Sequence, residues 1–240
     1  MSIKIENTEV LGWGSAIRGM RNPMNSWGMS DSGLTVMNPN DVEFGYEPNY
    51  EYIIGNNDLK LMASLAKAGT DHRKFMRMLT VYVDFTAPLY WWKEFDTYKV
   101  GTVANSCSTM HKIHAKKFTI DDFSCEHLLC LGKNADFEDL PIYANERWDA
   151  VLLLQMVIKS LNHYRDRFIE TKDKKYWWQM IQLLPTSYNQ KRTIMLNYEV
   201  LANIYKSRKN HKLDEWRTFC TWIEKLPYSK LITDKGGSDE

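Results

Sequence analysis

Polar side chains that could bind an anionic ligand are concentrated between Leu184 and Arg217. Amides, hydroxyls and cations of this kind donate hydrogen bonds to phosphate and carboxylate groups. The residues are Ser187, Asn189, Lys191, Arg192, Asn197, Asn203, Arg208 and His211. The surrounding stretch 171–212 holds nine Lys/Arg against two Asp/Glu, whereas residues 1–60 hold four against eight. Such a basic region fits a phosphate-bearing small molecule, RNA or a solvated face.

A second candidate stretch, Thr97–His111, is dense in small hydroxyl and amide residues. Asn105–Ser108 could contact a ligand, although Asn and Ser also favour turns for local reasons. Within it Cys107 could act as a nucleophile, but a small buried thiol is the more common role. His111 and His114 have no third ligand nearby in the sequence, and the four cysteines match no zinc spacing, so we expect no metal site.

The elements that must position these side chains are strands that lead into helices. Thr186–Leu196 alternates and carries β-branched and aromatic residues, which predicts a strand. Asn197 is placed to cap the helix that follows, and a surface helix with a solvated basic end is the alternative interpretation. Leu79–Phe85 is the clearest strand in the chain. Pro88 then opens a predicted helix over Leu89–Tyr98, because proline suits a first turn.

Other periodic segments complete an α+β chain with a small mixed sheet and many helices. Asn145–Ile169 is the longest predicted helix, and its wide apolar face must be buried against other elements or a symmetry mate. The remaining predictions are a strand at Ile3–Leu11, a loop-rich cover at Gly12–Gly33 with a short helix at Ser15–Met20, a turn-rich link at Asn38–Tyr50, helices at Asn57–Ala68, His72–Met78, Lys175–Leu183 and Leu213–Leu226, acidic helical pieces after Phe118, and a polar loop at Gly132–Tyr143.

Composition excludes several classes of protein. The 240 residues are 44% hydrophobic and include nine Trp, so the chain can bury a sizeable core and is not disordered. The net charge of +1 gives no global attraction to nucleic acid or to an anionic membrane. No apolar run reaches the length of a signal-peptide core or a membrane span. We therefore expect a single cytoplasmic domain over residues 1–240, with reduced thiols and no membrane partner.

The C-terminal stretch carries a pattern with a known counterpart. The pattern begins with Leu184-Pro185 and continues without a gap through Asn197, Leu201, Asn203 and Arg208. It resembles the C-terminal motif of flavin-dependent thymidylate synthases, which runs from Leu-Pro through Asn, Leu and Asn to Arg at this spacing. The family's flavin and nucleotide both carry phosphate, which suits the polar residues of this stretch.

A second match lies upstream, in the order that the family has. His72, the strand Leu79–Phe85 and Ala87-Pro88 with its helix look like the family's H-x-S-x-x-E-H motif, strand and helix. They place the family's signature, RHR-x-x-S-x-N-E-x-S-x-RY, on Thr97–His111. Together the two matches cover about two thirds of the chain.

The chain departs from the family's motifs at charged positions. At the positions of the RHR trio the chain has Thr97, Tyr98 and Lys99. Later in the signature it has Thr102 in place of the first Ser, Ser106 in place of Glu, and Met110-His111 in place of Arg-Tyr. Upstream, Arg77-Met78 replaces a Glu-His pair. Glu199 stands where the family carries a second flavin-contacting Arg. These changes leave two alternatives to methylation, namely a related hydroxymethylation of the pyrimidine ring and a relative that binds a nucleotide without catalysis.

The resemblance implies an enzyme with an α+β subunit that assembles as a homotetramer and binds FAD. It implies cofactor contacts from His72, Lys99, Thr102, Asn105, Asn197 and Asn203, and substrate contacts from Ser106, Ser108 and Arg208. The implied reaction methylates deoxyuridine monophosphate (dUMP) to thymidylate, using methylenetetrahydrofolate as the one-carbon donor, reduced flavin as the hydride donor and NADPH as the reductant. No protein nucleophile is required, so no catalytic residue is assigned.

An RNA- or DNA-binding protein is a hypothesis from a different class. It would use the basic stretch 171–212 with its interleaved aromatic residues. The near-neutral net charge and the lack of a recognised nucleic-acid motif weigh against it. We therefore expect no nucleic-acid partner.

Overall fold

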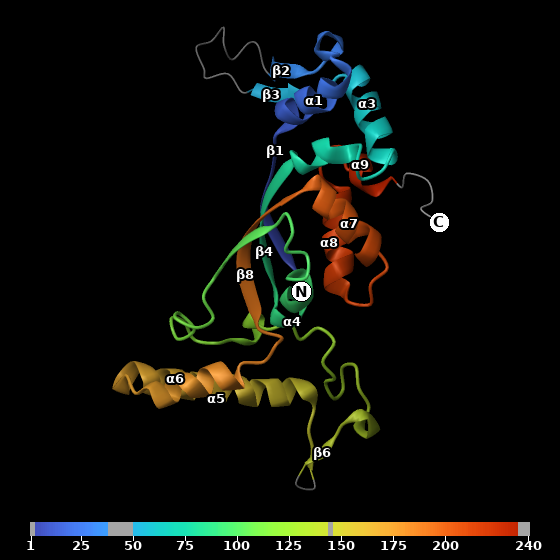
Figure 1. Cartoon of the computed structure of the whole chain (residues 1–240). Helices are drawn as coiled ribbons and strands as arrows, with labels where there is room; N and C mark the ends of the chain where they lie inside the picture. Colours follow the sequence, from blue (N-terminus) through green and yellow to red (C-terminus); the bar gives the residue numbers. More distant parts are fainter. Residues whose placement is uncertain (1–2, 38–49, 144–145, 235–240) are drawn as a thin grey trace. The chain divides into compact units, whose positions relative to one another are not determined.

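The computed structural model describes residues 3–37, 50–143 and 146–234. The predicted α+β class is confirmed, since the described residues form helices, a four-stranded sheet and smaller two-stranded sheets (Figure 1). The chain divides into two compact units. Unit 1 comprises Met1–Glu6, Asp84–Thr97 and Ala104–Thr193, and unit 2 comprises Asn7–Val83, Tyr98–Val103 and Ile194–Glu240.

The four-stranded sheet has the order β1-β4-β8-β5. Its strands are β1 (Lys4–Leu11), β4 (Thr80–Pro88), β5 (Val103–Ser106) and β8 (Asn189–Asn197). Three of them confirm the strands predicted at Ile3–Leu11, Leu79–Phe85 and Thr186–Leu196, with shifted ends. In β4, Val81 and Val83 are buried while Tyr82 between them is exposed, which is the period of two expected of a strand with one face in the core.

Unit 2 contains most of the short helices. Its elements are α1 (Trp13–Arg21), η1 (Asn22–Met24), η2 (Trp27–Met29), β2 (Gly33–Val36), β3 (Tyr50–Ile53), α3 (Asn56–Lys67), η3 (Arg73–Arg77), α7 (Tyr198–Arg208), α8 (Asp214–Glu224) and α9 (Lys230–Thr233). The predicted cover at Gly12–Gly33 consists of α1 and two 3-10 turns. Strands β2 and β3 pair antiparallel. Of the predicted link between them, residues 38–49 lie outside the described residues.

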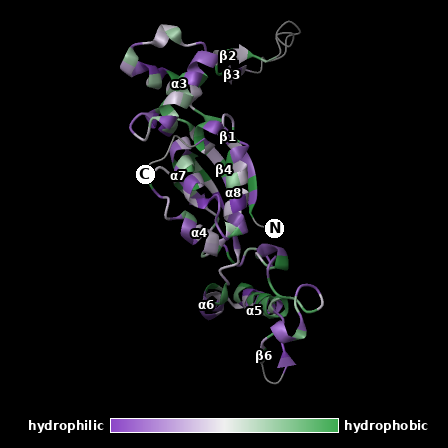
Figure 2. Ribbon diagram, turned by 90° about the vertical axis from the view of Figure 1, so that its right-hand side faces the viewer, coloured by the Kyte–Doolittle hydropathy of each residue, from purple (hydrophilic) through white to green (hydrophobic). Residues whose placement is uncertain are grey.

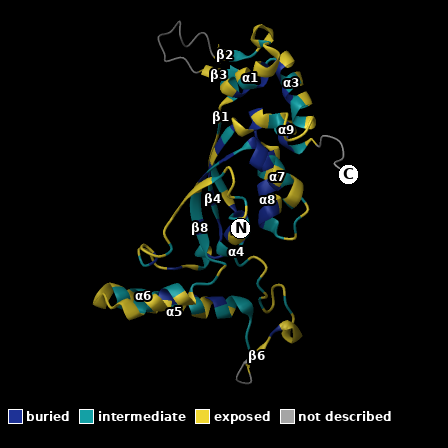
Figure 3. Ribbon diagram, in the orientation of Figure 1, coloured by how far each residue is buried: buried dark blue, intermediate teal, exposed yellow. Residues whose placement is uncertain are grey.

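Helices α7 and α8 carry much of the core of unit 2 (Figure 3). The fully buried side chains are Tyr198, Leu201 and Ile204 of α7 and Trp216, Phe219 and Ile223 of α8. They recur at helical spacing, so each helix turns one apolar face inward. This packing fixes the axis of α7, whose two ends carry residues that the sequence assigns to ligand binding.

A buried ionic cluster joins α1, α3 and the segment before β2. Asp58 is fully buried, and its carboxylate accepts hydrogen bonds from Arg21 Nε (2.6 Å), Ser30 Oγ (2.7 Å) and Ser32 Oγ (2.7 Å). The backbone N–H of Asp31 donates a further bond (3.1 Å). Burial by itself raises the pKa of Asp58, but the serine, arginine and backbone donors outweigh it and hold that pKa below its ordinary value. The ionised carboxylate therefore stabilises this part of unit 2.

Unit 1 is built around two adjacent helices. Its elements are α4 (Leu89–Phe95), η4 (Ile120–Asp122), η5 (Phe137–Asp139), β6 (Ile142–Tyr143), β7 (Glu146–Arg147), α5 (Ala150–Thr171) and α6 (Lys174–Leu183). Helices α5 and α6 run side by side (Figures 1 and 2). Their buried residues join a cluster of apolar side chains, namely Ile113, Phe118, Phe123, Leu154, Ile158, Leu161 and Met180. The predicted helix at Lys175–Leu183 is thereby confirmed.

Helix α5 begins later than predicted. It starts at Ala150 because Asp149 caps it, with Oδ1 accepting a hydrogen bond from the N–H of Leu152 (2.6 Å). The predicted start at Asn145 lies outside the described residues, and Glu146–Arg147 form β7. Part of the apolar side of α5 is exposed in this chain, including Leu152, which is 42% exposed.

Two further helix predictions are corrected. The acidic helical pieces expected after Phe118 reduce to the single turn η4, because the extended backbone of Phe123 ends it. Phe123 then extends and bridges to Tyr188. The helix predicted at Leu89–Tyr98 ends at Phe95, and Pro88 belongs to the end of β4 rather than to the first turn.

Within the described residues, no helix combines the length and the apolar character that crossing a bilayer requires.

Candidate functional site

In unit 2, the segment Tyr98–Thr102 lies against the start of α7. The segment is a turn, in which the N–H of Thr102 donates to the carbonyl of Lys99 (3.3 Å) and Thr102 Oγ1 donates to the carbonyl of Tyr98 (2.9 Å). Gly101 adopts φ +81°, which favours glycine. A Cβ there would lie 2.9 Å from Val200 Cγ2 and 3.3 Å from Asn197 Nδ2. The turn is therefore seated directly on the first residues of α7.

We expect Gly101→Ala to destabilise unit 2 more than the same change at Gly69. Both glycines have positive φ, and a Cβ at Gly69 would meet no atom within 4 Å. The backbone strain of about 1–2 kcal/mol is therefore shared, and the contact with Val200 adds an overpacking cost of about 1–3 kcal/mol at Gly101. Urea unfolding followed by tryptophan fluorescence measures the difference. Equal losses of stability in the two variants would show that the turn does not pack on α7.

Asn197 is the N-cap of α7, as the sequence predicts. Its backbone is extended, and Oδ1 accepts a hydrogen bond from the N–H of Val200 (3.0 Å). The cap uses the carbonyl oxygen of the amide, so Nδ2 is the atom of Asn197 that can donate to a ligand. This atom is also the one that faces Gly101. The plain capping role and a ligand contact are therefore compatible in one side chain.

Asn197→Ala is expected to lower the free energy of unfolding by about 1 kcal/mol, the usual cost of a lost N-cap. Asn203→Ala is a matched control because Asn203 is exposed within the same helix, where alanine is the better helix former. Chemical unfolding of the two variants makes the comparison. A loss at Asn203 as large as that at Asn197 would contradict the capping role.

Arg208, the last residue of α7, is held by two aromatic side chains. Its Nε donates a hydrogen bond to Tyr98 Oη (2.8 Å), and its Cζ lies 4.8 Å from the ring centroid of Trp216. Trp216 is fully buried, and its ring meets Tyr98 edge-to-face at 5.9 Å. Arg208 itself is half-buried. Tyr98 and Trp216 thus set the orientation of this guanidinium, and a guanidinium is a group that binds phosphate or carboxylate well.

Glu199 occupies the position where the family resemblance places a second arginine. Its negative charge is balanced by Arg73, which belongs to η3. Its carboxyl group is buried, and Oε2 lies 2.9 Å from Nε of Arg73 in η3. A guanidinium is thus present beside this position, although it comes from a different part of the sequence. His72, the residue before Arg73, is exposed at the start of η3.

Asn203 lies away from Arg208 on α7. The two residues are five apart, which separates them by about 140° around the helix axis. Asn203 is exposed, and a contact between it and a cofactor remains a prediction. Lys99, Thr102, Asn197 and Arg208 are therefore the predicted residues that unit 2 gathers along α7.

The other predicted ligand residues belong to unit 1. Asn105 and Ser106 are exposed at the end of β5. Ser108 Oγ accepts hydrogen bonds from the N–H groups of Met110 (3.3 Å) and His111 (2.8 Å). Ser108 therefore organises a turn, which is the local role that its residue type favours.

A part-buried polar network in unit 1 holds the segment around Cys107. Gln190 Nε2 donates to the carbonyl of Cys107 (2.7 Å), and Gln190 Oε1 accepts from Arg192 Nε (3.0 Å). Arg192 also forms an ion pair with Asp96 (2.8 Å) and lies 4.2 Å from the ring centroid of Trp92. This network could not be predicted from the sequence, because the presence of glutamine and arginine on a strand does not reveal which groups they contact.

A cavity of about 330 Å³ in unit 1 lies beside this segment. Cys107, Lys116, Tyr188 and Lys191 are among the residues that line it. Cys107 is exposed, so the prediction of a buried thiol was wrong, and the strand β5 before it leaves its side chain uncovered. Burial raises the pKa of Tyr188, with the charge of Asp122 acting in the same direction. The tyrosine therefore stays neutral near pH 7. The lining also includes Asp121 and Asp122, and its lysines form ion pairs, Lys116 with Asp122 and Lys191 with Asp84 (3.0 Å), so the cavity carries charges of both signs.

Among the described residues, no group of three or more His, Cys, Asp or Glu side chains is placed to hold a metal ion. His114, one of the two histidines that raised this alternative, packs its ring edge-to-face on Phe168 at 5.0 Å.

Comparison of the fold with solved structures identifies its class. The chain superposes on flavin-dependent thymidylate synthase ThyX from Helicobacter pylori, complexed with FAD and dUMP, with a TM-score of 0.62, 14% identity and coverage of 98% of this chain and 99% of that chain. A second structure of the same enzyme with FAD and dUMP gives a TM-score of 0.62, 15% identity and coverage of 99% and 100%. The chain thus has the fold of flavin-dependent thymidylate synthases, as the resemblance predicts.

A further structure with this fold is the UMP/dUMP methylase PolB from Streptomyces cacaoi bound with 5-Br dUMP. Its TM-score is 0.56, with 12% identity and coverage of 98% of this chain and 96% of that chain. No family model matches the sequence, and no curated protein matches it. At sequence identities this low, the likeness to these structures establishes a shared fold.

Proposed function

We propose that this chain is a flavin-dependent enzyme that transfers a one-carbon unit to C5 of a pyrimidine nucleotide, most simply converting dUMP to thymidylate. The observation that carries the proposal is the way the two motif segments meet along α7. Gly101 lies beside Asn197 at the start of the helix, and Tyr98 bonds Arg208 at its end. The solved structures with this fold that contain FAD and dUMP support the same assignment.

The residues at the start of α7 fit a phosphate-bearing cofactor such as FAD. A helix N-terminus favours anions, and Gly101 allows the backbone of the turn to approach it closely. Asn197 Nδ2 and the ammonium group of Lys99 are the donors that would hold the cofactor there. Thr102 Oγ1 donates its proton to the carbonyl of Tyr98, so it would accept a hydrogen bond from the cofactor. Arg73 offsets the charge of Glu199, so the pair adds no net negative charge to this end of the helix. When bound, the flavin supplies the hydride that reduces the transferred carbon.

Arg208 is the residue that would hold the nucleotide. Its forked guanidinium is pre-positioned by Tyr98 and Trp216, so little side-chain freedom is lost on binding a phosphate. The other proposed contacts are His72, Asn105 and Asn203 to the cofactor and Ser106 and Ser108 to the substrate. Methylenetetrahydrofolate would donate the carbon, and NADPH would reduce the flavin.

The sugar of the nucleotide, ribose or deoxyribose, is a second open property of the proposed substrate, because a solved structure with this fold is a UMP/dUMP methylase. The likeness to PolB favours testing UMP beside dUMP. Methylation and hydroxymethylation are distinguished by the product, which gains a methylene group in the first case and a methylene group plus an oxygen atom in the second.

We also propose that the chain assembles as a homotetramer. The support is the apolar surface that the α5 and α6 region leaves exposed, to which Leu152, Met156 and Trp178 contribute. An enzyme that consumes NADPH and a folate fits the cytoplasm, where the four free cysteines would stay reduced. Light scattering of the purified protein measures the assembly, and a monomer would contradict it.

Titration of the purified protein with FAD, with and without dUMP, tests cofactor binding. We expect a change in flavin absorbance and fluorescence that saturates, and a further change when dUMP is added. Riboflavin, which lacks the phosphates, is the matched control ligand and should bind more weakly. The absence of any spectral change with FAD, with or without dUMP, would overturn the proposal.

A further inference from the structure

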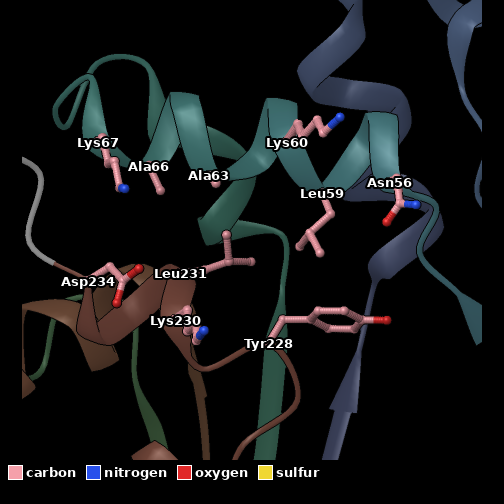
Figure 4. Close-up of a pocket in the computed structure, with 10 residues that line it drawn as sticks. All are labelled: Asn56, Leu59, Lys60, Ala63, Ala66, Lys67, Tyr228, Lys230, Leu231 and Asp234. Atoms are coloured by element: carbon pink, nitrogen blue, oxygen red, sulfur yellow. The ribbon is translucent and has the colours of Figure 1, made fainter.

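A cavity of about 400 Å³ lies in unit 2 between α3 and α9, apart from the motif residues (Figure 4). Leu59, Ala63 and Ala66 form its α3 wall, and Leu231 of α9 points toward them (Figure 4). The two alanines are too short to fill the space opposite Leu231. Ligand pockets typically occupy roughly 300–1,000 Å³, so the volume is sufficient for a small organic molecule.

The face of α3 that lines the cavity is not the face that anchors the helix. The buried residues of α3 are Asp58 and Met62, and each lies one position before a residue of the cavity wall. One position corresponds to about 100° around the axis. The cavity is therefore lined by a second stripe of apolar residues on α3, separate from the residues that the helix buries in the core.

The rim of the cavity is cationic. Lys60, Lys67 and Lys230 border it together with one acid, Asp234, so the charge of these four groups is 3 − 1 = +2. Within the described residues, none of the three lysines forms an ion pair. An apolar interior with uncompensated ammonium groups at its edge is complementary to a molecule with an apolar body and one negative charge.

One end of the cavity is formed by an aromatic residue in a strained conformation. Tyr228 has φ +52°, a region that costs free energy for a residue with a side chain. Its ring is fixed edge-to-face against Trp13, with 5.2 Å between the centroids. The fold thus holds a flat apolar surface at the end of the cavity, and sparsely populated backbone conformations of this kind cluster at ligand sites.

We propose that this cavity binds a medium-chain alkyl carboxylate or a carboxylate of similar shape. The alkyl chain lies between Leu59, Ala63 and Leu231, where it removes apolar surface from water. The carboxylate bonds the ammonium groups of Lys67 and Lys230 at the rim. The site is independent of flavin and nucleotide, because none of its residues belongs to the segments that would hold them.

Calorimetric titration of the full chain with decanoate, below its micellar concentration, tests the proposal. Decanol and decyltrimethylammonium carry the same chain with no charge and with a positive charge. We expect decanoate to bind at least about tenfold more tightly than either, since only it can pair with the lysines. Equal binding of the three amphiphiles, or no heat with decanoate, would overturn the proposal.

Two variants locate the binding. Lys67→Glu/Lys230→Glu is expected to weaken decanoate binding by about tenfold or more while leaving decanol binding unchanged. Ala63→Phe fills the space and should abolish binding of both. Lys74→Glu, at an exposed lysine of η3, is the control for charge reversal and should bind decanoate as the native chain does. A native affinity for decanoate in the double variant would contradict the assignment, and circular dichroism establishes that each variant is folded.

Discussion

Replacing Asp58 with alanine is expected to lower the free energy of unfolding by about 3–5 kcal/mol. The carboxylate is fully buried and accepts bonds from Arg21, Ser30, Ser32 and the backbone of Asp31. Its removal leaves the guanidinium of Arg21, which is 4% exposed, as a buried charge without its carboxylate. Urea unfolding monitored by tryptophan fluorescence measures the loss.

The double variant Arg21→Met/Asp58→Leu distinguishes the loss of the ion pair from the cost of leaving one buried charge unpaired. Removing both charges avoids an uncompensated buried ion, so the double variant should be more stable than Asp58→Ala alone. A double variant that is less stable than the single variant would contradict the view that the unpaired charge dominates the loss. Ser32→Ala removes one donor and should cost only about 1–3 kcal/mol.

The same carboxylate gives the protein a predictable response to acid. The pKa of Asp58 is lower in the folded state than its usual value near 3.9 in an unfolded chain. Near these two pKa values the unfolded state therefore binds more protons than the folded state. The free energy of unfolding consequently decreases as the pH decreases. The contribution of Asp58 is complete above about pH 5 and is lost as the pH falls through about 4 toward the folded-state pKa. Asp58→Asn should lack this component of the acid-induced loss, and an unchanged pH profile in that variant would contradict the assignment.

Replacing Arg208 with alanine is the second change with a large expected effect. Hydrogen bonds to a charged group contribute about 1.5–3 kcal/mol, so dUMP binding should weaken by about ten- to a hundredfold. Arg208→Lys keeps the charge but loses the planar fork, and an intermediate loss is expected. Titration of the FAD-loaded protein with dUMP measures each affinity.

Two controls distinguish a ligand contact from a packing effect of Arg208. Lys206→Ala removes an exposed cation from the same helix and should leave dUMP binding unchanged. Tyr98→Phe removes the hydroxyl that orients Arg208 while keeping the ring, so it should weaken binding less than Arg208→Ala. Native affinity for dUMP in Arg208→Ala would exclude this residue from the substrate site.

The sequence predicted those parts of the fold that depend on local patterns. The strand at Leu79–Phe85 alternates, and the position of Asn197 before an apolar period predicts a cap that the structure confirms. The start of α5 was misplaced because Asp149, rather than a residue near Asn145, supplies the capping oxygen. Both residue types can cap a helix, so composition alone could not decide between them.

Contacts between distant residues could not be predicted from one sequence. Tyr98 and Arg208 are 110 positions apart, and the family motif identified Arg208 without indicating that tyrosine would hold it. Gln190 and Cys107 are similarly remote in the sequence. Asp58 and Arg21 belong to different helices, and their burial follows from packing rather than from any periodic pattern.

Release of tritium from dUMP labelled at C5 tests the central claim most directly, because any one-carbon transfer to this carbon must expel its hydrogen. The assay contains the native chain, FAD, methylenetetrahydrofolate and NADPH, and its product is identified by mass. We predict tritium release that requires all three, a product heavier by one methylene group, and a rate reduced in Arg208→Ala at subsaturating dUMP. A native chain that binds FAD and dUMP but releases no tritium under these conditions would contradict the account.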